Sequence, residues 1–117
     1  MRRGEIWTVS GGPDHARKAR PAAIVQDDVF DATASITICA FTTDRTDAPL
    51  FRLEVQPSDH NGLREACRLM VDKITTVPKS KIGRRIGRLD DRDILRLDRA
   101  MLVFLGLALA PRTRRRR

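Results

Sequence analysis

The sequence predicts a mainly β protein, in which an antiparallel sheet curls into a small barrel and one C-terminal helix covers part of it. About six short runs of apolar or alternating side chains recur between residues 4 and 89, which is the pattern of strands. No helical segment of a dozen residues separates these runs, so the crossovers that a parallel sheet needs are absent. A chain of 117 residues fits one domain.

The first three predicted strands are the most regular. Residues 4–10 alternate around Trp7, and turn-forming residues follow them as a loop that becomes basic. Residues 21–26 form a short apolar run that begins at a proline, which strands tolerate at their first position. We expect this strand to be buried on both faces. Residues 35–42 are rich in β-branched side chains, which favour a third strand.

The second half of the chain predicts three further strands and a helix. The strands are residues 50–55, which alternate strictly from Phe51, then residues 68–74, and then residues 84–89. A brief helical turn is expected at residues 78–82.

The C-terminal helix is the clearest predicted element. Asp90 can cap its N-terminus, and acidic side chains in the first turn suit the helix dipole. Pro111 should end it. Apolar residues recur at helical spacing at Ile94, Leu97, Met101, Leu105 and Ala108.

The charge of the chain is divided between a mildly basic domain and a strongly basic end. The net charge is +8, and residues 112–117 hold five arginines, which leaves +3 for the other 111 residues. We expect one domain over residues 1–111 and a basic, disordered tail over residues 112–117. A basic balance favours a polyanionic partner, although the tail alone specifies no function.

The cysteines and the apolar runs indicate a cytoplasmic protein that binds no metal or cofactor. Cys39 and Cys67 are not in a CxxC spacing, so a zinc site is not expected. The longest apolar run, residues 101–110, is about half of the ~20 residues that a membrane span requires. No secretory signal is recognisable at the start of the chain.

The residues that usually catalyse reactions are few. His15 and His60 are the only histidines, and both are predicted in loops, with nothing in the sequence to bring them together. The sequence has no HExxH, P-loop or GxSxG motif.

Phosphoryl transfer without a metal would then depend on arginine and hydroxyl side chains. RNA permits this chemistry because its 2′-OH is an internal nucleophile beside the scissile phosphate. A guanidinium group can bind two phosphate oxygens at once.

Several segments together resemble the MazF/PemK family of toxins. They are Arg3–Trp7, Arg20–Gln26, Cys39–Thr43, Ala66–Val77 and Ile86–Leu89, followed by the terminal helix. Each segment alone is short, but their order and spacing extend over residues 2–109.

The resemblance implies an SH3-like barrel of the CcdB/PemK type and a homodimer. It also implies sequence-specific, metal-independent cleavage of single-stranded RNA to 2′,3′-cyclic phosphate and 5′-OH ends. The implied partner is a cognate antitoxin with an acidic, extended segment that covers the RNA groove.

Site residues follow from the same resemblance, position by position. Arg20 would contact and polarise the scissile phosphate, and Thr42 would donate a hydrogen bond to it. Whether Arg20 also acts as the base stays open, because a guanidinium group is a poor base in water, with a pKa above ~12. The expected RNA-binding residues are Arg17, Lys18, Thr43 and Gln26.

Two other functions remain as alternatives. A CcdB-like inhibitor of DNA gyrase would share the barrel and the dimer without being an enzyme, but that kind of protein depends on an aromatic C-terminal end, and this chain ends in arginines. A non-catalytic nucleic-acid-binding barrel would account for the charge alone. It predicts binding that weakens steeply with salt and no cleavage.

Overall fold

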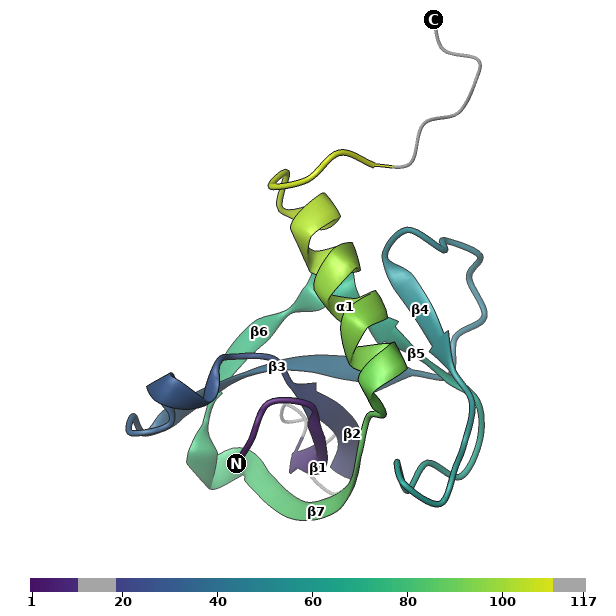
Figure 1. The fold of residues 1–117 in the computed structure, drawn as a ribbon. Helices are drawn as coiled ribbons and strands as arrows, with labels where there is room; N and C mark the ends of the chain where they lie inside the picture. The colour runs from purple at the N-terminus through teal and green to yellow at the C-terminus, as the bar shows by residue number, and fades with distance from the viewer. Residues whose placement is uncertain (11–18, 111–117) are drawn as a thin grey trace, which may run out of the picture.

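A computed structural model of the chain describes residues 1–10 and 19–110. These residues form seven strands and one long helix, as Figure 1 shows. The elements are β1 (Glu5–Ser10), β2 (Ala19–Ile24), β3 (Ser35–Thr42), β4 (Arg52–Val55), β5 (Cys67–Met70), β6 (Thr75–Pro78), β7 (Ile82–Arg88) and α1 (Asp91–Phe104). Single turns of 3₁₀ helix occupy Asp28–Phe30, Val71–Lys73 and Lys79–Lys81.

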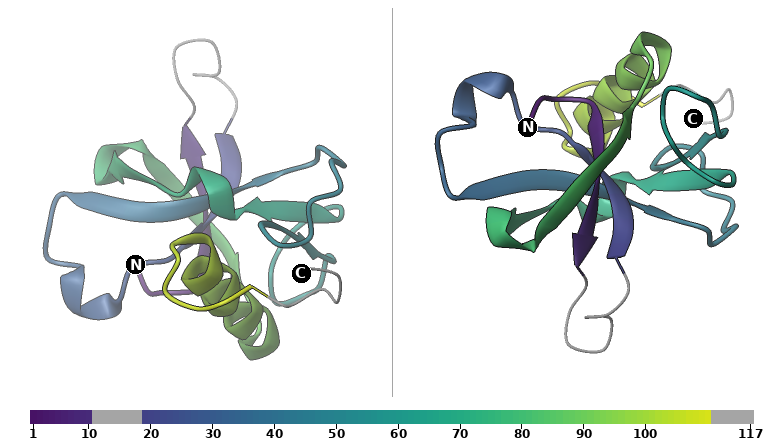
Figure 2. Two further views of the ribbon diagram at one scale, coloured as in Figure 1. Left: turned by 90° about the horizontal axis from the view of Figure 1, so that it is seen from above. Right: turned by 90° about the horizontal axis from the view of Figure 1, so that it is seen from below.

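The strands form one antiparallel sheet, which confirms the predicted β architecture with a terminal helix. Their order is β4-β5-β3-β2-β1-β7, and β6 pairs with β3 beside the β5 contact. Figure 2 shows β1 and β7 crossing β3 at a large angle, so the sheet is strongly curled.

The curled sheet does not close into a complete barrel. Within the described residues, the end strands β4 and β7 do not pair with each other. The loop between β4 and β5 lies against β7 instead, where the Arg88 N–H donates to the His60 carbonyl oxygen at 2.8 Å. Gly87 is required there, because a Cβ atom would lie 2.4 Å from the Asn61 backbone.

Two apolar clusters fill the two faces of the sheet. The larger one includes Ile6, Cys39 and Leu69 and is covered by Leu97 and Ala100 of α1. The smaller one consists of Val9, Ala22, Ile24, Ile36 and Ile38. Because Ala22, Ala23 and Ile24 are all buried, β2 contributes to both clusters, as expected for a strand covered on both faces.

α1 begins where it was predicted and ends earlier. The Asp90 carboxylate accepts a hydrogen bond from the Asp93 N–H at 2.8 Å, which confirms the cap. The helix stops at Phe104 because Gly106 has a φ of +77° and the Leu107 N–H folds back to the Leu102 carbonyl oxygen. Leu105 therefore lies beyond the helix and is exposed, contrary to the predicted stripe. No described helix is long and apolar enough to cross a membrane.

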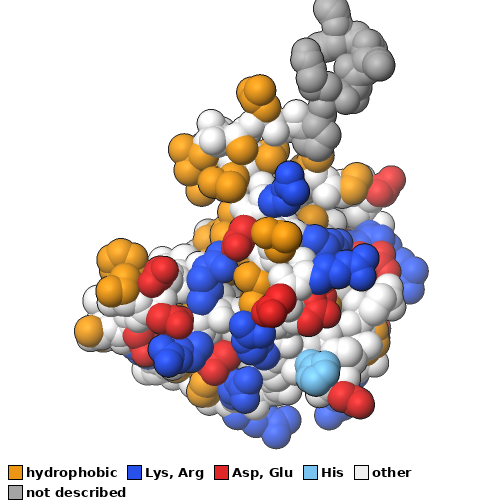
Figure 3. Space-filling view, viewed as in Figure 1, with side chains coloured by type: hydrophobic (Ala, Val, Ile, Leu, Met, Phe, Trp, Pro, Cys, Tyr) orange, Lys and Arg blue, Asp and Glu red, His pale blue; other side chains and the backbone are white. Residues whose placement is uncertain are grey.

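The segment around the end of α1 carries most of the exposed apolar side chains. They gather at the top of the molecule in Figure 3. They include Leu102, Phe104, Leu105, Leu107 and Leu109, the last with 91% of its surface exposed.

Strand boundaries after residue 65 differ from the prediction. The strand expected at residues 68–74 ends at Met70, because the chain turns through the 3₁₀ helix Val71–Lys73. The chain then forms β6, which was not predicted, and its pairing of Val77 with Ile36 is a long-range contact. The helical turn expected at residues 78–82 is present at Lys79–Lys81.

Candidate functional site

The register of β2 and β3 aligns the two residues predicted to be catalytic. Ala22 pairs with Ala40 and Ile24 with Ile38, so the same register extended by two residues places Arg20 opposite Thr42. Because side chains alternate between the faces of a sheet, Arg20 and Thr42 belong to one face, together with Ala22 and Ala40. The two residues come from segments that are twenty-two positions apart in the chain, and the sheet brings them to the same end of the strand pair.

The side chain of Arg20 is exposed, and the described residues offer it no ion pair. Other arginines differ: Arg52 is bound to Asp72 through two hydrogen bonds of 2.8 and 3.2 Å, and Arg68 is paired with Glu54. The Arg20 guanidinium can therefore receive an anion without first breaking a contact within the described part of the chain.

The Thr42 hydroxyl is oriented by its own loop. Its Oγ1 accepts a hydrogen bond from the Asp44 N–H at 3.1 Å. No described residue accepts the hydroxyl proton, and Thr42 is half-buried at the last position of β3. A hydroxyl held in this way can donate a hydrogen bond to a phosphate oxygen.

Two depressions meet beside Thr42 and Thr43. The first has a volume of about 280 Å³ and is lined by Thr42, Asp44, Arg45 and Arg68, among others. The second, of about 1020 Å³, extends from Ala19 and Pro21 to β7. Ala19 and Pro21 face the side of β2 opposite to Arg20, so this depression lies on the other face of the sheet, and Arg20 lines neither depression. Both are lined by Thr43, Glu65 and Cys67, so they form one continuous groove past the end of β3.

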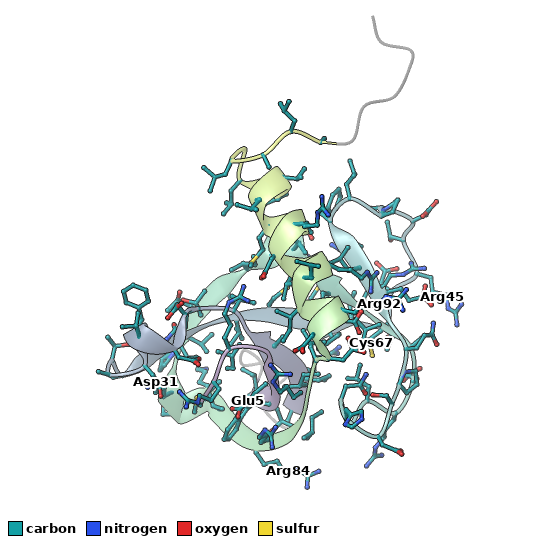
Figure 4. The ribbon with its side chains drawn as sticks, viewed as in Figure 1. Glu5, Asp31, Arg45, Cys67, Arg84 and Arg92 are labelled. Atoms are coloured by element: carbon teal, nitrogen blue, oxygen red, sulfur yellow. The ribbon has the colours of Figure 1, made fainter. Side chains whose placement is uncertain are left out.

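Arginines outnumber acidic residues along this groove. Arg45 and Arg68 line its first part, and Arg64, Arg84 and Arg85 line its second part. Figure 4 shows Arg84 projecting from β7 at the lower edge of the molecule and Arg45 projecting at the right. Sequence reasoning did not select these arginines. The consecutive arginines at 84 and 85 inside a strand were the available signal.

Of the predicted RNA-binding residues that the structure describes, Thr43 lies in the groove and Gln26 does not. Gln26 lies past the other end of β2, roughly 20 Å of extended chain from Arg20. Its amide group bridges two backbone groups, accepting from the Thr37 N–H at 2.9 Å and donating to the Phe30 carbonyl oxygen at 3.2 Å. Arg17 and Lys18 lie outside the described residues, as do His15 and the arginine tail. Thr43 lines both depressions.

The two cysteines are unsuited to act as nucleophiles. Burial, with a further contribution from the charge of Asp72, raises the pKa of Cys39 to about 12. Burial and the nearby Glu65 carboxylate also raise the pKa of Cys67, which lines the groove. Both thiols stay protonated at neutral pH, and a protonated thiol is a poor nucleophile. Among residues 1–10 and 19–110, no three His, Cys, Asp or Glu side chains gather as a metal site would require.

Comparison with known proteins gives consistent results. A model of the family of PemK-like, MazF-like toxins of type II toxin–antitoxin systems matches residues 2–105. The chain is 52% identical to a probable endoribonuclease MazF of Mycolicibacterium smegmatis, over 92% of this chain and 99% of that protein. It is 30% identical to endoribonuclease MazF9 of Mycobacterium tuberculosis, over 92% and 98% of the two chains.

Solved structures share the fold at lower sequence identity. An endoribonuclease in complex with its cognate antitoxin, from a mycobacterial species, superposes with a TM-score of 0.77 at 24% identity, over 94% of this chain and 99% of that chain. A MazE–MazF crystal structure from Deinococcus radiodurans gives a TM-score of 0.73 at 16% identity, over 91% and 96% of the two chains.

Proposed function

We propose a mechanism by which this chain cleaves RNA, and the premise is that the chain belongs to the family of PemK-like, MazF-like toxins of type II toxin–antitoxin systems. It is the toxin component of such a system and a MazF-type endoribonuclease. Its substrate is single-stranded RNA, which it cuts at specific sequences.

The observation that carries the catalytic proposal is the β2–β3 register. Arg20 and Thr42 belong to one face at one end of the strand pair, and Thr42 also lines the arginine-rich groove. In this proposal, the Arg20 guanidinium binds the non-bridging oxygens of the scissile phosphate, and the Thr42 hydroxyl donates to one of them. Both interactions strengthen as negative charge accumulates on phosphorus in the transition state, which is what lowers the barrier.

The reaction uses the nucleophile that the substrate already carries. The 2′-oxygen forms a bond to phosphorus, and the bond between phosphorus and the 5′-oxygen breaks. The products are a 2′,3′-cyclic phosphate and a 5′-OH, with the 2′-OH proton lost and a proton gained by the leaving oxygen. Solvent water can accept the 2′-OH proton and supply the proton that the 5′-oxygen gains, because the guanidinium cation that binds the phosphate has no lone pair with which to accept a proton.

Two partners belong to the proposal. A cognate antitoxin with an acidic, extended segment would cover the groove and neutralise its arginines. A second copy of the chain would form a homodimer. Exposed apolar side chains around the end of α1 support a protein interface there, since soluble monomers rarely expose large contiguous apolar patches. The site of action is the cytoplasm, where the RNA is.

We assign the catalytic unit to one domain, residues 1–111. The basic residues 112–117 would add affinity for RNA without reading its sequence. Deleting them should weaken binding mainly at low salt and leave the cut sites unchanged, which mapping the cut sites at two salt concentrations checks.

The test is incubation of the purified full chain with a long single-stranded RNA in EDTA, followed by mapping of the fragment ends. Discrete cuts with 5′-OH ends are expected, absent for Arg20→Ala and retained for Arg92→Ala, which removes an exposed arginine from α1. Uncut RNA would overturn the proposal. Inhibition of DNA supercoiling would then indicate a gyrase inhibitor, and salt-sensitive binding alone would indicate a passive nucleic-acid-binding barrel.

A further inference from the structure

The larger depression of the groove has the composition of a nucleotide subsite. Its apolar surface includes Pro21, Leu63 and Ile86. Arg64 lies on one wall, in the segment between β4 and β5, and Arg84 lies on the other wall, in β7. Its volume of about 1020 Å³ lies just above the 300–1,000 Å³ range of small-molecule sites, so it has room for a nucleotide.

The backbone of β7 is shaped to present Arg84 at this position. The pairing of β1 with β7 has two irregularities, one between Ile6 and Trp7 and one between Trp7 and Val9. They lie on either side of Arg85, which is opposite Trp7, and Arg84 lies within the second one. The Arg84 N–H donates to the side-chain hydroxyl of Thr8 in the neighbouring strand β1, at 3.0 Å. Gly83 permits this contact, because a Cβ atom there would lie 2.3 Å from Thr8 Oγ1. Bulges of this kind redirect side chains near functional sites.

The opposite wall is held in place by a hydrogen-bond network around Asn61, which is 4% exposed. Its side-chain oxygen accepts from the backbone N–H groups of Ser58 and Leu63, each at 3.0 Å, and its amide nitrogen donates to the Gln56 carbonyl oxygen at 2.8 Å. Arg64 follows directly after this network. Its backbone is therefore fixed before any ligand binds.

The charges on the two walls are available to a ligand. Arg85 is paired with Glu5 at 3.4 Å. Neither Arg64 nor Arg84 forms an ion pair with a described residue, and both are exposed. Two guanidinium groups that line one partly apolar depression, and that have no ion pair with a described residue, match a nucleotide, whose base is flat and apolar on its faces and whose phosphate is anionic.

We infer that this depression binds a nucleotide adjacent to the scissile phosphate, with Arg84 and Arg64 on its phosphate and the base against Pro21, Leu63 and Ile86. This inference rests on the proposed ribonuclease function and extends it. Thr43 lines both depressions and directly follows Thr42, so a strand with its scissile phosphate at Arg20 and Thr42 reaches this subsite by passing around the end of β3. Arg84 and Arg64 are thus substrate-positioning residues, separate from Arg20.

The test measures binding and cleavage separately. The RNA is an oligonucleotide containing the mapped cut site, with a 2′-deoxy residue there for the binding assays so that it cannot be cut. Arg84→Gln should raise its Kd and KM about tenfold, the effect of losing one charge-assisted contact, with kcat within about twofold. The slope of log binding constant against log salt should fall by about 0.7. Arg92→Gln is the matched control with equal loss of charge.

A phosphate scan locates the contact. Each phosphate in turn is replaced by an uncharged methylphosphonate. At one position next to the cut, the replacement should cancel the penalty of Arg84→Gln, because the two changes remove the same contact. If no position couples to Arg84, or if Arg84→Gln binds no worse than Arg92→Gln, the subsite is wrong even though the wild type cleaves. A wild type that cleaves no RNA would instead reject the ribonuclease function on which the subsite rests.

Discussion

The two ends of the β2–β3 strand pair use their polar side chains in opposite ways. At one end, Arg20 and Thr42 keep hydrogen-bonding capacity that the described residues do not use. At the other end, Gln26 bridges two backbone groups, Asp28 accepts from the Arg3 N–H at 2.6 Å, and Asp31 is paired with Lys79 at 2.9 Å. One end is therefore free to bind a ligand, and the other holds the chain together. Substitutions should affect activity at the first end and stability at the second.

The largest effect is expected from Arg20→Ala. Loss of the guanidinium should lower kcat by about 10²–10³-fold, which is the usual effect of removing a hydrogen-bond donor that contacts the negative charge of the transition state. The melting temperature should stay within about 1 °C of the wild type, since no described residue pairs with this side chain. Single-turnover cleavage and thermal denaturation measure the two quantities. A large loss of stability would make Arg20 structural and remove the contrast between the two ends.

Thr42→Val should have the next largest effect, lowering kcat by about tenfold because one neutral donor to the phosphate is lost. The Arg20→Ala/Thr42→Val double variant should be less impaired than the product of the two single effects, since both residues act on the same phosphate. Fully multiplicative effects would show that the two side chains act at separate places.

Gln26→Ala should have the reverse outcome. It removes two hydrogen bonds and should destabilise the protein by about 1–2 kcal/mol, with the cut sites and kcat of the remaining folded protein unchanged. Urea denaturation and fragment mapping test this. A change in the cut sites with normal stability would restore Gln26 as an RNA-binding residue and contradict the division between the two ends.

The smallest effect concerns acid stability. Hydrogen bonding from Lys79, opposed by partial desolvation and helped by the N-terminal amine, holds the pKa of Asp31 below its ordinary value of 3.8. A lowered folded-state pKa stabilises the fold above pH 3.8, and this contribution is lost as the pH falls through the folded pKa. Asp31→Asn should therefore be less stable than the wild type at pH 6 and nearly equal to it at pH 2. Melting curves that differ equally at both pH values would exclude the charge of Asp31 as the cause.

The sequence predicted those strands and helix ends that are determined by residues close together in the chain. The apolar alternation of β1 and β3 and the Asp90 cap are set by neighbouring residues, and they were found. β6 was missed because Thr75 and Thr76 are exposed, and only the distant β3 makes this segment a strand. The end of α1 was placed too late because Gly106 stops the helix before Pro111 can.

The candidate site was predictable in part for a different reason. Arg20 and Thr42 came from the resemblance to a family, and the β2–β3 register then supplied a geometric reason for pairing them. The arginines of β7 carry one weak local mark of function, which is that two of them are consecutive. Only the bulged pairing with β1 decides that Arg85 is bound to Glu5 while Arg84 has no ion pair with a described residue.

The irregular shape of β7 also affects how copies of the protein meet one another. β7 ends the sheet, and a regular edge strand offers its free backbone groups to any passing chain, which is a common start of aggregation. Two bulges distort this edge, and Arg84, Arg85 and Arg88 place like charges along it. Neighbouring molecules are thus kept from joining sheet to sheet, so a surface suited to a polyanion also protects the protein's solubility at high concentration.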